Sequence, residues 1–523
     1  MVKPFHVLCL SAMLSGLTTG ASQADTLVDA LVQAYQSNPT LQSQRYDLKA
    51  LDEAYARARA GIRPAAELQF SGEYVGSRAG NTTQSLRLVA DPTVGRHLDT
   101  NQSDVRLVVE QLLYSGGRAS SGIDAAAFRV QAGREALRSL EGDLLLQVVT
   151  TYADVLRDEE ALDVRLANLK SLERQLEMTQ ARKVAGEVTA TDVAQADAQL
   201  EAAQAQITYA HVQLQASRAA YAALVGKNPG TLEALPDLPL MPASLDDAFD
   251  RSEDSSPELS QARFNERESQ KQIEVAKASK SLSVSVRTSY GVTGELVPYY
   301  IDNQDQAWTV TINVSKPLFS GGVNQSSYRE ALDRNAGDRL RIEAARRQVM
   351  QNVILAWNNI AAARQNMLVQ ERQLKAAQLA ALGMNEEFRY GQRSTLDLLV
   401  AEQNLRDAEL SQINSRHDAY VAEATLLRQI GYLEARALLV GLELYDPSKN
   451  LRDVKEKGDV PWEGLVARTD RLGVGHVATV RIDQPAKSLD ARMASIASAS
   501  RLTPEIATES RIMPAPGTTG SAQ

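Results

Sequence analysis

The sequence Gln111-Leu112-Leu113-Tyr114-Ser115-Gly116-Gly117 recurs as Lys316-Pro317-Leu318-Phe319-Ser320-Gly321-Gly322, at an offset of 205 residues. The same offset relates Gly186, which is followed by Asp192, to Gly391, which is followed by Asp397. An offset that stays constant over more than a hundred positions leaves no room for insertions or deletions. Long rigid elements require such constancy, whereas loop-rich domains rarely show it. We therefore predict a chain built from two tandem structural repeats.

Each repeat is predicted to contain a helix, two strands, a long helix, a tight turn and a shorter helix. Asn38-Pro39 and Ser256-Pro257 are typical of a helix N-cap followed by proline in the first turn. The long helix from Arg118 to Ala185 should span roughly 100 Å, at about 1.5 Å per residue. We assign residues 25–226 to the first repeat, 227–244 to a connector near the middle of the long helices, and 245–450 to the second repeat.

The predicted strands alternate polar and apolar residues, as in Glu67 to Phe70, Val105 to Leu107, Ser283 to Arg287 and Thr309 to Ser315. This period suits strands that face lipid on one side and water on the other, but a soluble amphipathic hairpin has the same pattern. The stretches Gly76 to Thr100 and Gly291 to Gln306 are predicted to be exposed loops.

Four strands cannot close a barrel, because about eight is the practical minimum. An open sheet edge in lipid leaves unpaired backbone groups that cost several kcal/mol each. If the strands lie in a membrane, other copies of the chain must therefore complete the barrel.

The long helices carry apolar residues at matched positions in the two repeats. Their spacing is typical of a coiled-coil-like seam, which we interpret as the packing core between helices. The matched positions are Leu137, Leu144, Val148, Tyr152, Val155, Leu162 and Leu169 in the first repeat, and Ile342, Val349, Val353, Trp357, Ile360, Met367 and Leu374 in the second.

Residues 1–24 are predicted to be a secretory signal, with Lys3, an apolar run and small residues before Asp25. The only cysteine, Cys9, lies in this segment, so the mature chain is expected to contain no disulfide. A net charge of -9 argues against nucleic-acid binding. Residues 451–523 are rich in Pro, Ser, Thr, Ala and charge, and are predicted to be a disordered periplasmic tail.

The sequence contains no catalytic motif that we can identify. The histidines are scattered without metal-ligand spacing, and Gly116-Gly117 and Gly321-Gly322 lack the Gly-Lys-Ser/Thr of a phosphate loop. Backbone freedom explains these glycines better, at points where a strand becomes a helix. We predict no enzymatic activity, no cofactor and no metal.

The paired strand-to-helix junctions and the segment Tyr390-Gly391-Gln392-Arg393-Ser394-Thr395-Leu396-Asp397-Leu398-Leu399 resemble the TolC family of outer-membrane export channels. The resemblance covers roughly Asp25 to Asn450. It implies a mainly α fold with a membrane β-barrel, in which a homotrimer forms a twelve-stranded barrel in the outer membrane of a Gram-negative bacterium. That barrel continues into a long periplasmic α-helical barrel that tapers shut.

The resemblance also implies a passive exit duct of a tripartite export system. Its partners would be a periplasmic membrane-fusion adaptor, an inner-membrane RND pump or ABC exporter, and outer-membrane lipid. The sequence does not reveal whether the cargo is a small molecule or a secreted protein. The alternative is a non-conducting periplasmic coiled-coil stalk or adaptor. Adaptors usually have one hairpin flanked by β-rich domains, whereas this chain has two hairpins, each preceded by a strand pair.

By the same resemblance, Asp192 and Arg393 are acidic and basic lock residues at the hairpin tips, and Asp397 lines the pore constriction. The turns at Gly186 and Gly391 would form these tips and contact the adaptor. Two positions depart from the family's best-known member. Phe388 replaces a lock tyrosine, and Val400 replaces a second aspartate of the constriction, which puts strong cation selectivity and metal-ion blockage in doubt.

Helix capping equally explains Asp192 and Asp397, because aspartate often caps a helix that restarts after a turn. The two roles can coexist. Three copies of one aspartate converging on an axis would repel one another and raise their own pKa values.

Overall fold

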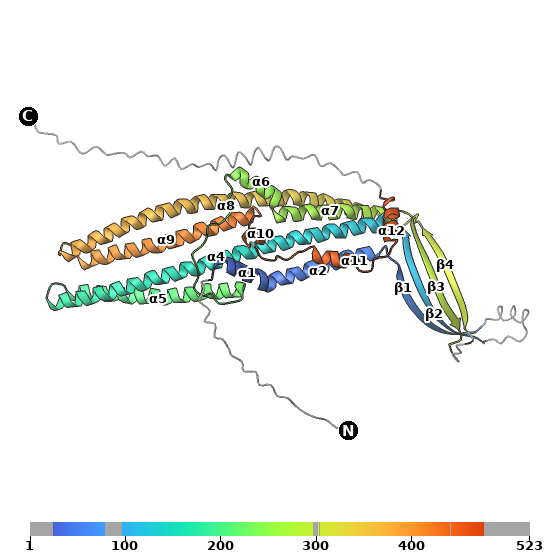
Figure 1. Cartoon of the computed structure of the whole chain (residues 1–523), viewed down its shortest axis with the longest axis horizontal. Coiled ribbons are helices and arrows are strands. Elements are labelled where there is room, and N and C mark those ends of the chain that lie inside the picture. Colours follow the sequence, from blue (N-terminus) through green and yellow to red (C-terminus); the bar gives the residue numbers. More distant parts are fainter. Residues whose placement is uncertain (1–24, 79–96, 297–301, 303, 440, 475–523) are drawn as a thin grey trace, which may run out of the picture. The chain divides into compact units, whose positions relative to one another are not determined.

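The structure is a computed structural model that describes residues 25–78, 97–296, 302, 304–439 and 441–474. The predicted secretory signal and residues 475–523 of the predicted tail lie outside these residues. The first repeat comprises α1 (Leu27–Ser37), α2 (Pro39–Ala60), β1 (Ala65–Arg78), β2 (His97–Tyr114), α4 (Arg118–Val184) and α5 (Ala190–Val225). The second comprises α6 (Leu245–Ser255), α7 (Pro257–Ala278), β3 (Ser283–Gly294), β4 (Asp305–Ser315), α8 (Val323–Arg389) and α9 (Thr395–Gln429). Helices α10 (Ala435–Leu438), α11 (Lys449–Glu456) and α12 (Glu463–Arg471) follow (Figure 1).

The predicted helix starts are confirmed. The Asn38 side chain accepts hydrogen bonds from the Thr40 and Leu41 amides, and proline occupies the first turn of α2. Ser256 caps α7 in the same way. The long helices α4 and α8 are both 67 residues long, as expected if the chain was duplicated without insertions in this part.

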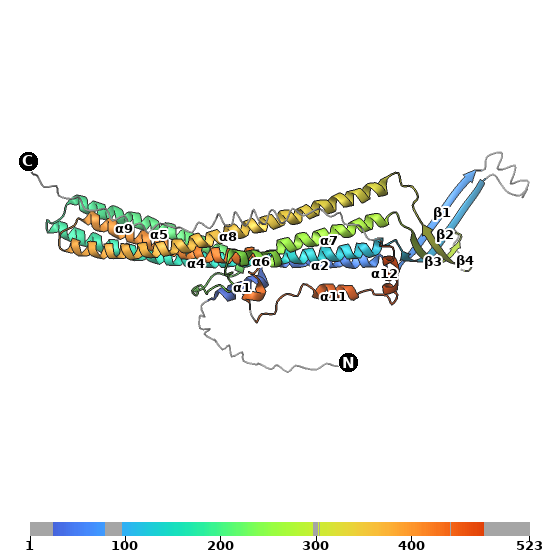
Figure 2. The same cartoon turned by 90° about the horizontal axis from the view of Figure 1, so that it is seen from above.

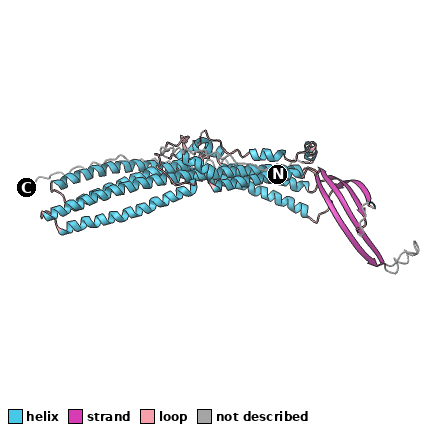
Figure 3. Cartoon of the chain, turned by 60° about the horizontal axis from the view of Figure 1, so that its bottom comes forward, coloured by secondary structure: helices cyan, strands magenta, loops and turns pink. Residues whose placement is uncertain are grey.

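The four strands form one antiparallel sheet in the order β1-β2-β3-β4, drawn in magenta beside the cyan helices in Figure 3. Its register separates two faces, because residues paired across antiparallel strands point to the same side. The polar face carries an ion pair between Glu110 and Arg287, whose side chains are paired across β2 and β3. The other face, which we call the apolar face, includes Leu68, Phe70, Val105, Leu107, Val286, Tyr290, Trp308, Val310 and Ile312.

The strands are longer than the sequence predicted. β1 continues to Arg78 and β2 starts at His97, so the predicted loop from Gly76 to Thr100 is wrong at both ends. β3 likewise continues to Gly294. Glycine lowers strand propensity, but here pairing with the neighbouring strand maintains the extended backbone. Gly291, for example, lies opposite Arg106, and a Cβ at Gly291 would approach the Arg106 Cβ to 2.7 Å.

Helix α4 is packed on several sides, against α2, α5, α7 and α9 (Figures 1 and 2). Helix α8 packs mainly against α7 and α9. All predicted seam residues of α4 except Leu169 are buried, and Tyr152 has no exposed surface. In α8 only Val349, Val353 and Ile360 of the predicted seam are buried, and Trp357, the counterpart of Tyr152, is half-buried. The two repeats have the same elements but different surroundings.

Among the described residues, no helix is both long and apolar enough to cross a membrane.

The connector between the repeats is fixed to the middle of α4. The Tyr152 hydroxyl donates its one proton in a bifurcated hydrogen bond to the backbone carbonyl oxygens of Asp25 and Glu233, at 2.9 and 2.8 Å. Asp25 also forms a β-bridge with Leu232. These contacts join the start of the described chain and the connector to one buried side chain.

The prediction that the chain is disordered after residue 450 is wrong for residues 451–474, which contain most of α11 and all of α12. Two buried carboxylates hold this segment. Glu463 pairs with Arg59 and with Arg63, at 2.8 Å from the Nε of each. Asp470 accepts hydrogen bonds from the backbone amides of Ser115, Gly117 and Ser120. Amino-acid composition alone does not predict that residues 451–474 are ordered, because it does not show that Glu463 and Asp470 are buried against partners from other parts of the chain.

Candidate functional site

The turn between α4 and α5 forms the first hairpin tip. Gly186 has a φ of +79°, in the left-handed region that favours glycine. The Glu187 amide donates to the Arg182 carbonyl at 2.9 Å and the Gly186 amide donates to the Lys183 carbonyl at 3.0 Å, which closes the C-terminus of α4. The helix therefore ends at a defined point, and the chain reverses within a few residues.

The turn between α8 and α9 repeats this geometry. Gly391 has a φ of +74°, and the Gln392 amide donates to the Glu387 carbonyl at 2.9 Å. A Cβ at either tip glycine would have no heavy atom within 4 Å. Backbone conformation, rather than crowding within the chain, therefore explains the glycine at each tip.

Thr189 and Ser394 are the N-caps of the helices that restart after the two turns, and Asp192 and Asp397, each the third residue of its helix, complete a capping box with them. The Asp192 carboxylate accepts hydrogen bonds from the Thr189 amide at 2.8 Å and the Thr189 hydroxyl at 2.7 Å. Asp397 accepts from the amide and hydroxyl of Ser394 at 3.2 and 2.8 Å. These side-chain hydrogen bonds lower the pKa of both aspartates. The prediction that these aspartates take part in helix capping is confirmed, but the N-cap positions themselves belong to Thr189 and Ser394. Both aspartates are anionic at neutral pH.

Arg393 lies on the turn before α9, but it does not contact Asp192. Its Nε donates to Glu387 at 2.7 Å, and this interaction raises the pKa of the arginine. Among the residues that the structure describes in this chain, there is no ion pair between Asp192 and Arg393. A lock between these two side chains is therefore absent within one chain, because the turn directs Arg393 back toward the last residues of α8.

Phe388 and Val400 have different surroundings. Phe388 is buried, and the Arg182 guanidinium lies 4.7 Å from its ring centre, a cation–π contact between the last turns of α4 and α8. Val400 is 51% exposed. Sequence reasoning missed Arg182, since an arginine in the last turn of a helix is ordinary and its partner is about 200 residues away.

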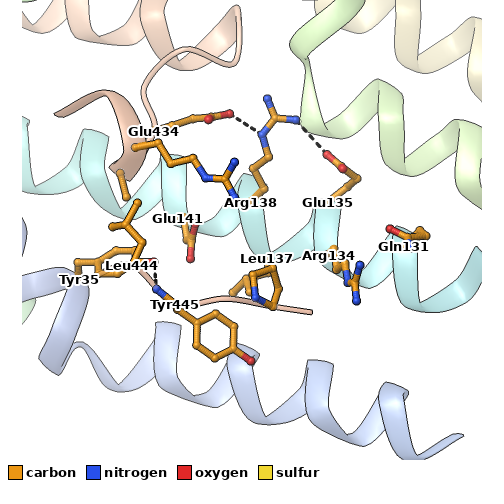
Figure 4. A pocket seen from close by; sticks show the side chains of 13 residues that line it. Tyr35, Gln131, Arg134, Glu135, Leu137, Arg138, Glu141, Glu434, Leu444 and Tyr445 are labelled. Atoms are coloured by element: carbon orange, nitrogen blue, oxygen red, sulfur yellow. Dashed lines mark hydrogen bonds and ion pairs between the residues drawn. The ribbon is translucent and has the colours of Figure 1, made fainter. Parts of the chain in front are cut away.

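A second group of charged side chains surrounds a cavity of about 420 Å³ beside the first third of α4, between Gln131 and Glu141 (Figure 4). Arg138 bonds to both Glu135 and Glu434 there. Glu141 lies nearby, and burial raises the pKa of its carboxyl to about 7, although Arg45 opposes this shift. The Arg45 guanidinium lies 4.5 Å from the ring centre of Tyr35 and 3.9 Å from the Glu141 carboxylate.

Comparison with known proteins decides which family contains this arrangement of paired hairpins. The profile of the outer membrane efflux proteins matches residues 30–227 and 249–432. The chain belongs to the outer membrane efflux protein family. The predicted resemblance to TolC channels is thereby confirmed, and the protein is an outer-membrane export channel of a Gram-negative bacterium.

Individual relatives agree with this assignment. The chain is 28% identical over 462 residues to the outer membrane efflux protein BepC of Brucella suis biovar 1 (strain 1330), covering 88% of this chain and 96% of that relative. It is 24% identical over 451 residues to the outer membrane protein TolC of Escherichia coli (strain K12), covering 84% and 88% of the two chains.

The fold also resembles that of the Neisseria gonorrhoeae MtrE outer membrane channel in its open state. The TM-score is 0.66 at 20% identity, covering 79% of this chain and 90% of that one. The outer membrane efflux proteins are transport channels, in keeping with the absence of a recognisable catalytic motif in this sequence.

Proposed function

We propose that this outer membrane efflux protein works as a homotrimer whose sheets close one barrel and whose hairpins close one tapered duct. The observation that carries this proposal is the unequal burial of equivalent residues. Leu113 at the first junction is 37% exposed, whereas its counterpart Leu318 is 91% exposed, as is the following Phe319. Every residue of β4 is exposed. An apolar junction and an open strand edge left uncovered in one chain would be covered by a second copy.

The closed entrance of the duct would lie at the hairpin tips. Arg393 and Asp192 are on turns of separate hairpins, and the Arg393 side chain is 48% exposed. In the proposed trimer, Arg393 of one hairpin pairs with Asp192 of the neighbouring hairpin, and three copies of Asp397 ring the constriction. Hydrogen bonds from Thr189 and Ser394 lower the pKa values of Asp192 and Asp397 and so favour their ionised forms, which supports a charged lock. Because exposed ion pairs contribute only up to about 1 kcal/mol each, such a lock can open without unfolding the helices.

The tips would also contact the periplasmic adaptor. Val184, the last residue of α4 and two residues before Gly186, is 91% exposed, and Tyr390, directly before Gly391, is 78% exposed. Exposed apolar side chains on rigid turns are suited to docking another protein. We propose that the adaptor and an inner-membrane RND pump or ABC exporter supply the cargo and the energy, while this chain conducts passively.

Planar-bilayer conductance tests the proposed lock. The mature protein is compared with the Asp192→Ala/Arg393→Ala double variant and with Arg389→Ala as the matched control. Arg389 is also exposed at the second tip, but it pairs with Glu386 within its own helix. We expect low conductance for the parent and the control, and a conductance several-fold higher for the double variant.

Two results would count against the proposal. Equal conductance of the parent and the double variant would refute the lock while leaving the channel intact. No conductance from any folded preparation would favour the non-conducting stalk. Deleting the gene, then comparing drug susceptibility with the profile of secreted proteins, would separate small-molecule cargo from protein cargo.

A further inference from the structure

Helix α12 lies at the end of the sheet where β2 meets α4 and contacts both of these elements (Figure 1). The Trp462 indole donates a hydrogen bond to the Gln111 side chain at 3.2 Å. Gln111 is paired with Val286, so its side chain points to the apolar face. At the other end of the helix, a Cβ at Gly473 would lie 2.4 Å from the Tyr114 hydroxyl. The helix is therefore held beside the strand ends and on the apolar side of the sheet.

The acidic residues of α12 all point inward. Glu463 is 6% exposed and Asp470 is fully buried. Glu463 forms ion pairs with Arg59 and Arg63, and Asp470 accepts a hydrogen bond from the Ser115 amide in the junction before α4. Burial alone would raise the pKa of Asp470, but the hydrogen bonds from Ser120 and Ser115 lower it overall. The inward face of α12 therefore accounts for all its negative charge.

The outward face carries only apolar, small, hydroxyl and basic side chains. Trp462 is 48% exposed, Leu465 is 67% exposed and Leu472 is 86% exposed. Arg468 and Arg471 are exposed among them, and Arg471 also lies 3.2 Å from Asp124 of α4. No exposed residue between 461 and 472 is acidic. Tryptophan, leucine and arginine on one side of a short helix are typical of a helix that lies at a membrane surface.

We propose that α12 is an interfacial anchor whose outward face rests on the phospholipid headgroups of the periplasmic leaflet. The inference relies on the outer-membrane location of the channel. The apolar face of the sheet ends where α12 begins, so Trp462 would enter the headgroup region at the edge of the hydrocarbon layer. Arg468 and Arg471 would meet lipid phosphates, whose charge complements theirs. The anchor would fix the depth of the strand-to-helix junction in the membrane.

Fluorescence quenching of labels on single introduced cysteines tests this placement. No other cysteine competes for the label if Cys9 is removed with the predicted signal. Leu465→Cys and Leu472→Cys are labelled with bimane in the full mature channel, reconstituted into vesicles of phosphatidylethanolamine and phosphatidylglycerol. Ile312→Cys on β4, 66% exposed on the apolar face, is the lipid control. Leu379→Cys on α8, 74% exposed and near the second tip, is the water control. Each sample is quenched separately by brominated lipid and by aqueous iodide.

We expect brominated lipid to quench the labels at positions 465 and 472 to an extent comparable with position 312, and at least about twofold more than position 379. Labels at 465 and 472 that respond only to iodide, while 312 responds to lipid, would overturn the anchor but not the membrane location. Labels protected from both quenchers would place this face against a second copy and would also overturn the proposal. A label at position 312 that brominated lipid does not quench would show that the apolar face of the sheet does not contact lipid, and would overturn the anchor as well.

Discussion

Replacing Glu141 with glutamine should make the channel more stable at pH 8 and should remove a pH dependence of its stability. Burial raises the pKa of Glu141 to about 7 from the ordinary value of 4.5, and the side chain is only 19% exposed. In the folded state the carboxyl therefore keeps its proton up to a higher pH than in the unfolded chain. The folded state then binds more protons between these two pKa values, so stability falls as pH rises through that interval.

The magnitude follows from the size of the shift. Each pKa unit corresponds to about 1.4 kcal/mol, so ionising Glu141 in the folded state costs about 3 kcal/mol above pH 7. Below pH 4.5 the cost is absent, since both states hold the proton. Glutamine has nearly the same shape and no charge to bury. Glu141→Gln should therefore match the parent at pH 4.5 and exceed it by up to about 3 kcal/mol at pH 8.

Thermal unfolding in detergent, followed by circular dichroism at several values between pH 4.5 and pH 8, measures the effect. Glu160→Gln on the same helix is the matched control, because the Glu160 side chain is 48% exposed. The reasoning fails if Glu141→Gln is less stable than the parent at pH 8. That result would mean that the ion pair with Arg45, 3.9 Å away, outweighs the burial of the charge.

Three further predictions concern single contacts. Asp470→Asn should lower the unfolding free energy by about 3 kcal/mol, because the amide group that replaces Oδ2 cannot accept the hydrogen bond from the Ser120 amide. Asp459→Asn, which changes an exposed carboxylate, is the control. Equal melting temperatures of the two variants would contradict the predicted loss of stability. Arg182→Ala should lose about 1 kcal/mol of contact with Phe388 and speed hydrogen exchange in the last turn of α8, whereas unchanged exchange would show that the contact does not hold the two hairpins together. Gly391→Ala should destabilise the second tip by about 1 kcal/mol, because the φ of Gly391 is +74°. Gly383→Ala, inside α8, is the control and should be neutral or stabilising. Faster amide hydrogen exchange in Gly383→Ala than in Gly391→Ala would refute the argument.

Local signals predicted the regular elements well. Asn38-Pro39 fixed the start of α2 because a cap and a proline act within one turn, and the period-two stretch around Thr309 located β4. The tip turns were also readable, since Gly186 and Gly391 each precede a capping box. These features depend on interactions between residues close together in the sequence.

Features that depend on distant partners were not predictable. The order of α12 arises from Glu463 meeting two arginines about 400 residues earlier, and nothing near Glu463 in the sequence signals this pairing. The contact between Arg182 and Phe388 is of the same kind. The proposed lock between Asp192 and Arg393 came from family resemblance, not from local pattern, and it stays a prediction about the assembled channel.

The two Gly-Gly junctions have kept one backbone shape under unequal constraints. Gly117 and Gly322 have nearly the same φ, +89° and +87°. A Cβ at Gly117 would come within 2.5 Å of Val474, whereas at Gly322 it would meet nothing within 4 Å in the chain. Asparagine, which tolerates a left-handed backbone, would therefore fit the second junction of a single chain but not the first. After duplication, the two copies of the motif became free to accept different mutations, even though their shape did not change.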